Sequence, residues 1–211
     1  MLETKKISIH RALAELKLLD KQIADATESV VAVKANRKSN TKIDGFEVNE
    51  YKQRMQSSFD KVVGLINYRN KLKAAVVQSN ALTKVSVAGT CMTVAEAIER
   101  KTSIEYERAL LNDLRHEYRK AVAAVNANND ALPAKLETYL VNILGSKDKQ
   151  SAEEVKLHTD TFMKRNEYEL LDPLNITKVI DKLQESINAF ETDVDAVLSE
   201  SNATTFIEIT I

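Results

Sequence analysis

A long amphipathic segment near the start of the sequence covers residues 8–33, SIHRALAELKLLDKQIADATESVVAV. Aliphatic residues recur along it in steps of three and four: Ile9, Ala12, Leu16, Leu19, Ile23, Ala26, Val30 and Val33. A sustained heptad of this kind is typical of a coiled-coil seam. Ser8 stands just before the seam and suits an N-cap. We therefore predict a long helix over this segment, followed by a polar loop at 35–41.

Comparable patterns predict further helices at 47–78, 93–125, about 133–144, 151–169 and 175–199. Capping boxes at Thr93–Glu96 and Ser151–Glu154 would open two of them. Pro133 suits the first turn of the short helix, and Gly145 suits the residue after its end. Asn126–Asp130 is predicted as a loop. The seam of the last helix is as regular as the first.

Three short stretches favour strands instead. Asp44-Gly45 and the Gly89 region, within 83–92, each predict a small β-hairpin. The tail 204–211 is β-prone and is predicted to pair with residues 5–9, joining the two termini. That pairing would bring the first and last helices together, so we expect their seams to pack against each other.

Composition supports helices over sheets. The 211 residues include only 4 Gly and 2 Pro, and aromatic residues make up 5%. Folds that reverse direction often need more Gly and Pro, which disfavours sandwiches, barrels and doubly wound sheets. The predicted fold is mainly α: long antiparallel helices in a coiled-coil-like bundle, with a small β-hairpin and β-prone termini. We expect a single elongated helical domain over 1–211.

The charge balance and the cysteine content limit the partners and the compartment that the sequence suggests. Lys and Arg number 30 against 31 Asp and Glu, so the chain lacks the basic excess of a general nucleic-acid binder. The lone Cys91 excludes an internal disulfide and suits a reducing compartment. We see neither a signal peptide nor an apolar run long enough to span a bilayer. The expectation is a cytoplasmic protein, in the host cytoplasm if viral, with no membrane or nucleic-acid partner.

Motifs for catalysis are absent. The sequence has no Gly-rich phosphate loop, no G-x-S-x-G and no H-E-x-x-H. Its three histidines, His10, His116 and His158, share no ligand spacing. We therefore expect neither an enzyme nor a cofactor or metal site.

The densest polar cluster lies at the end of the second predicted helix and just beyond it. Its candidate ligand-binding residues are Asn67, Tyr68, Arg69, Asn70, Lys73, Asn80 and Thr83. Amides, a planar guanidinium, an ammonium group and a tyrosine ring suit a phosphate-bearing ligand, with or without a base. The alternative is a solvated helix end with Asx turns. Arg69 also stands where the heptad calls for an apolar residue.

A second candidate is a basic line on the third helix. Lys101, Arg108 and Arg115 lie seven residues apart on its seam. Since burying an unpaired charge is costly, they must be paired or hydrated. They either meet carboxylates of a neighbouring helix or form an anion site between subunits, which Arg69 would join.

Three stretches carry a family resemblance: residues 9–16, residues 69–101, and 172–174 with 193–205. They resemble a group of small helical phage and bacterial proteins often labelled septicolysin-like. That group is similar to viral sponge (anti-CBASS) proteins, which sequester cyclic-nucleotide immune signals. The resemblance implies an oligomer of long helices that holds ligand at subunit contacts, without turnover.

Two functions follow as hypotheses. The first is a homo-oligomeric binding protein that sequesters a phosphate-bearing ligand such as a cyclic nucleotide, serving phage immune evasion. The second is a phage or bacterial structural or assembly protein that acts through coiled-coil contacts. Long aliphatic stripes that one slim bundle cannot easily hide favour a homo-oligomer under either hypothesis.

Overall fold

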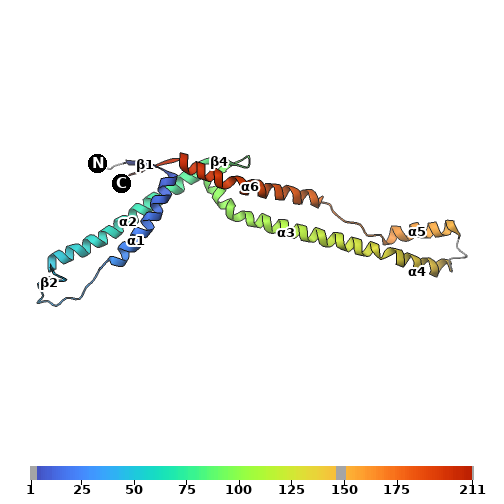
Figure 1. Cartoon of the computed structure of the whole chain (residues 1–211), viewed down its shortest axis with the longest axis horizontal. Helices are drawn as coiled ribbons and strands as arrows, with labels where there is room; N and C mark the ends of the chain where they lie inside the picture. Colours follow the sequence, from blue (N-terminus) through green and yellow to red (C-terminus); the bar gives the residue numbers. More distant parts are fainter. Residues whose placement is uncertain (1–3, 146–150, 211) are drawn as a thin grey trace. The chain divides into compact units, whose positions relative to one another are not determined.

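The computed structural model describes residues 4–145 and 151–210, and helices dominate it, which confirms a mainly α fold (Figure 1). The helices are α1 (Ile9–Ser29), α2 (Val48–Leu82), α3 (Val94–Asp130), α4 (Leu132–Leu144), α5 (Ala152–Asn166) and α6 (Ile176–Thr204). Within the described residues, no helix is long and apolar enough to cross a membrane.

Small antiparallel strand pairs accompany the helices, as predicted. They are β1 (Thr4–Ser8) with β6 (Phe206–Thr210), β2 (Lys42–Ile43) with β3 (Phe46–Glu47), and β4 (Lys84–Val87) with β5 (Thr90–Thr93). The β1–β6 register places Ile7 opposite Ile207, which joins the two ends of the chain. In both hairpin turns the two central residues have positive φ, including Gly45 at 89° and Gly89 at 76°. Two such residues are what a type I′ turn requires, and this explains the glycines.

The chain divides into two compact units. The first unit runs to Thr102 and resumes at Ala189, and the second spans Ser103–Asn188. This division does not test whether the chain forms the single elongated domain predicted over 1–211.

In the first unit, α1 and α2 lie side by side and antiparallel (Figure 1). Their core cluster takes residues from α1, α2 and the β1–β6 ribbon: Ile7, Ile9, Ala12, Leu16, Leu19, Leu72, Val76, Ile207 and Ile209. Among the described residues, this cluster contains none from α6. The prediction that the first and last helical seams pack together is therefore wrong. The termini do pair, but α2 occupies the seam of α1.

Helix α1 ends at Ser29, four residues before the predicted end. Val30 is extended, with φ −72° and ψ 124°, and Val33 is 88% exposed. Valines lose side-chain freedom in a helix and gain nothing when they find no packing partner. Helices α2 and α6 instead run on past their predicted ends, to Leu82 and Thr204.

Helix α3 begins as predicted and ends later. Its Thr93–Glu96 capping box is formed: the Glu96 amide donates to Thr93 Oγ1 at 3.1 Å, and the Thr93 amide donates to Glu96 Oε2 at 2.6 Å. The predicted loop at 126–130 is wrong, because α3 continues through Asp130. Asn128 Nδ2 donates to the carbonyl of Ala124 at 2.7 Å, so this amide is satisfied within the helix.

Asn129 has a different role in the second unit. Its Nδ2 donates to the Tyr168 carbonyl at 2.9 Å, and its Oδ1 accepts from the Tyr168 amide at 2.8 Å. The side chain thus holds the segment after α5 by both of its backbone groups. Farther along, Asp172 accepts from the Ile176 amide at 2.9 Å and opens α6.

Helices α4 and α5 form an antiparallel pair around Tyr139, whose ring lies 5.1 Å from that of Phe162. Pro133 and Gly145 stand at the start and end of α4, as predicted. Ser151 does precede α5, but its side chain makes no capping hydrogen bond, so the second predicted capping box is not formed.

Candidate functional site

Two predicted ligand-binding residues of α2 face α1. Tyr68 Oη donates to Glu15 Oε1 at 2.6 Å, and Lys5 Nζ lies 3.0 Å from Glu15 Oε2. Burial alone would raise the pKa of Glu15, but the hydrogen bonds from Tyr68 and Lys5 outweigh it, so this pKa lies below its ordinary value. The hydrogen bond to Glu15 likewise raises the pKa of Lys5. This network joins β1, α1 and α2.

Arg69 also contacts α1. Its Nε donates to Asp20 Oδ1 at 2.9 Å, with the two side chains 34% and 57% exposed. A guanidinium on the seam is thus paired across the two helices. A partly exposed pair of this kind contributes about 0.2–1 kcal/mol.

The rest of the predicted α2 cluster spreads along the helix. Asn67, Asn70 and Lys73 are exposed, whereas Asn80 and Thr83 are half-buried at the C-terminal end. Thr83 lines a cavity of about 360 Å³ between the end of α2 and β6.

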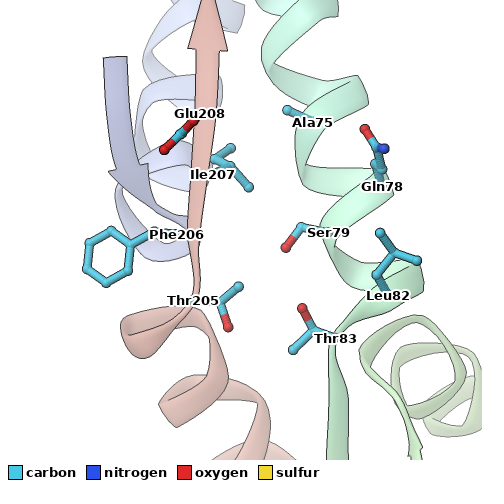
Figure 2. A pocket seen from close by; sticks show the side chains of 9 residues that line it. All are labelled: Ala75, Gln78, Ser79, Leu82, Thr83, Thr205, Phe206, Ile207 and Glu208. Carbon is cyan, nitrogen blue, oxygen red and sulfur yellow. The ribbon is translucent and has the colours of Figure 1, made fainter. Parts of the chain in front are cut away.

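Figure 2 shows how this α2–β6 cavity is built. Ser79, Thr83 and Thr205 face the space between the two elements, while Phe206 points away from it. Glu208 is the charged residue of its lining, which includes no Lys or Arg. Glu208 points to the same side of β6 as Phe206, away from these hydroxyl groups, so the cavity offers hydroxyls but no cation to bind a phosphate (Figure 2).

The basic line on α3 falls into three separate environments. Lys101 forms an ion pair with Asp195 of α6, as the pairing alternative expects. Arg108 Nε lies 3.8 Å from Glu105 Oε1 on its own helix.

Arg115 borders a cavity of about 290 Å³ in the second unit. The lining comes from two helices: Arg115, Tyr118 and Arg119 of α3, and Thr177, Ile180 and Asp181 of α6. We call this the α3–α6 cavity. Arg119 Nε donates to the carbonyl of Arg115 at 3.2 Å. Within residues 4–145 and 151–210, neither guanidinium forms an ion pair.

The residues that line the α3–α6 cavity can bind an anion. Two guanidinium groups supply planar donors for phosphate oxygens, and a tyrosine lies between them in sequence. Buried Ile180 adds an apolar surface. Thr177 belongs to the first turn of α6, where the helix dipole favours negative charge.

The sequence pointed to Arg115 but missed its neighbours. The spacing of Arg115, Tyr118 and Arg119, at i, i+3 and i+4, puts all three on one helical face, and this signal was available. The contribution of Thr177 and Asp181 could not be predicted from the sequence, because it depends on how α6 lies beside α3.

The described residues hold no group of three or more His, Cys, Asp or Glu side chains placed to bind a metal ion. Comparison with family models, curated proteins and solved structures finds no match to this chain.

Proposed function

We infer that the protein is a non-enzymatic, homo-oligomeric binding protein that sequesters a phosphate-bearing small ligand such as a cyclic nucleotide. The resemblance to viral sponge proteins makes evasion of a nucleotide-based immune signal its biological role. To bind a phosphate, a site needs cationic side chains that do not already form ion pairs within the protein. The candidate sites of this chain differ in that respect.

One observation carries the proposal: Arg115 and Arg119 line the same cavity, and neither is in an ion pair within the described residues. Arg69 and Lys101, by contrast, are each matched to a carboxylate. Two guanidinium groups and one carboxylate line the cavity, which leaves a net positive charge that a bound anion neutralises. Charged hydrogen bonds to phosphate are each worth about 1.5–3 kcal/mol.

Thermal unfolding of the full chain with a panel of cyclic mononucleotides and dinucleotides tests this proposal. A ligand present at about 100 times its Kd stabilises the folded protein by about 2.7 kcal/mol. Arg115→Gln should reduce the shift by about half at the same ligand concentration, because losing one charged hydrogen bond weakens binding by about tenfold. Arg11→Gln, the same change of charge at an exposed position of α1, should preserve the shift. A panel in which no nucleotide raises the melting temperature contradicts the proposal.

A specific observation favours the alternative, an assembly protein that acts through helix contacts. Phe59, Val63 and Ile66 follow one another along α2 at steps of four and three and remain 50%, 37% and 38% exposed. An apolar stripe of this kind is suited to contact another helix. Both functions predict a particle larger than the 23.6 kDa chain in light scattering, so the nucleotide panel separates them: the melting temperature of an assembly protein should not respond to nucleotides.

A further inference from the structure

The carboxylate of Asp181 sets what the α3–α6 cavity can accept. Two cations and one anion line it, which leaves a net single positive charge. Asp181 forms no ion pair within the described residues, and its carboxylate is exposed. It therefore faces any bound ligand as a full negative charge and a strong hydrogen-bond acceptor.

We propose that Asp181 makes this cavity selective for a singly charged phosphodiester that carries a free hydroxyl group, as a cyclic mononucleotide does, over a phosphate monoester. The inference rests on the proposed function and names its ligand class. The assigned contacts are Arg115 and Arg119 to the phosphate, Tyr118 to the base, and Asp181 to the ribose hydroxyl.

Charge balance supports this choice. A phosphodiester has one negative charge, which neutralises the net positive charge of the lining. A phosphate monoester at neutral pH carries about 1.5–2 negative charges, which leaves the occupied cavity negatively charged. The excess charge of the monoester is repelled by Asp181 at close range, which lowers the affinity of the monoester relative to the diester. A hydroxyl group that donates to the same carboxylate gains a charge-assisted hydrogen bond.

The size of the cavity agrees with a small ligand. Its volume of about 290 Å³ lies just below the range of small-molecule sites, which span about 300–1,000 Å³. One nucleotide unit is therefore the appropriate occupant of a single cavity. Tyr118 and Ile180 give the base an aromatic and an aliphatic surface.

Calorimetric titration of the full chain with cyclic AMP and with AMP tests the proposal. We expect cyclic AMP to bind about tenfold more tightly than AMP, a difference of about 1.4 kcal/mol. Asp181→Asn should strengthen AMP binding by about tenfold and weaken cyclic AMP binding severalfold, so that the preference for cyclic AMP is reversed. Glu185→Gln is the matched control, since it removes the same charge one turn farther along α6 and outside the lining.

The outcomes distinguish this inference from the function on which it rests. If cyclic AMP binds but Asp181→Asn leaves the preference for it unchanged, Asp181 does not select the ligand, and the sequestering function still stands. Unchanged cyclic AMP affinity in Arg115→Gln would overturn the inference and the assignment of the binding site to the α3–α6 cavity, while nucleotide sequestration at another site would still stand. If neither nucleotide binds the wild-type chain, the inference falls, and the nucleotide panel then decides whether the proposed function falls with it.

Discussion

Two arginines show how differently the two units use the same kind of seam position. Arg69 of α2 meets Asp20 across a packed helix pair, and its neighbour Tyr68 donates to Glu15. Arg115 of α3 borders a cavity with Asp181 among its lining residues, but it forms no ion pair within the part of the chain that the structure describes. The seam pattern alone treats both arginines as interruptions of an apolar stripe. What separates them is the partner helix, which supplies a carboxylate in the first case and an opening in the second.

The first way to break this comparison is to remove apolar side chains from both places. Leu72→Ala in the α1–α2 core should lower the free energy of unfolding by about 3 kcal/mol, because Leu72 is fully buried and leaves a void. Ile180→Ala should cost less, about 1–2 kcal/mol, because Ile180 borders an existing cavity. Chemical denaturation measures both, and equal losses would show that the second unit packs as tightly as the first.

The second test concerns the Tyr68–Glu15 hydrogen bond. Tyr68→Phe should lower the free energy of unfolding by about 1 kcal/mol at neutral pH, because a partly exposed charged hydrogen bond is lost. Tyr106→Phe, at a tyrosine that is 80% exposed, is the matched control and should change nothing.

The sign of the pH effect follows from Glu15. Its pKa is lowered in the folded protein, so its stabilising contribution is complete above the unfolded pKa and is lost as pH falls through the folded value. The stability gap between wild type and Tyr68→Phe should therefore shrink between about pH 7 and about pH 3. Denaturation curves at both pH values measure it, and a gap that widens in acid would contradict this account of the network.

Much of the fold was predictable because its signals are local. The glycine turns, the Thr93–Glu96 capping box and the heptads depend on residues near in sequence, and each produced its element. The misplaced features depend on distant contacts. The length of α3 past Asn126 accompanies a bond from Asn129 to Tyr168, and the partner of the α1 seam is decided by how α2 returns along it. The same limit applies to the candidate sites: Arg115 could be singled out, but Asp181 belongs to α6.

The third test weakens that long-range contact. Asn129→Ala removes both hydrogen bonds to the Tyr168 backbone and should cost about 1 kcal/mol, a modest value because both residues lie near the surface. Asn128→Ala removes one bond within α3 and should cost less. Amide hydrogen exchange gives the local measurement: the Tyr168 amide should exchange faster in the first variant only. Equal exchange in both variants would mean that Asn129 does not hold the segment.

The smallest expected effect on stability concerns Arg69 and Arg115. Arg69→Leu should cost at most about 1 kcal/mol, because its pair with Asp20 is partly exposed and the leucine fits the apolar seam. Arg115→Leu should leave stability unchanged or raise it slightly, since no ion pair is lost and an apolar side chain joins Ile180. Only Arg115→Leu should weaken nucleotide binding, by about tenfold or more for one charged hydrogen bond. Melting curves without ligand, beside a titration of each variant, give all four values. If Arg69→Leu were to abolish binding while Arg115→Leu preserved it, the ligand would bind at the α1–α2 pair, and the unpaired arginines of the α3–α6 cavity would need another explanation.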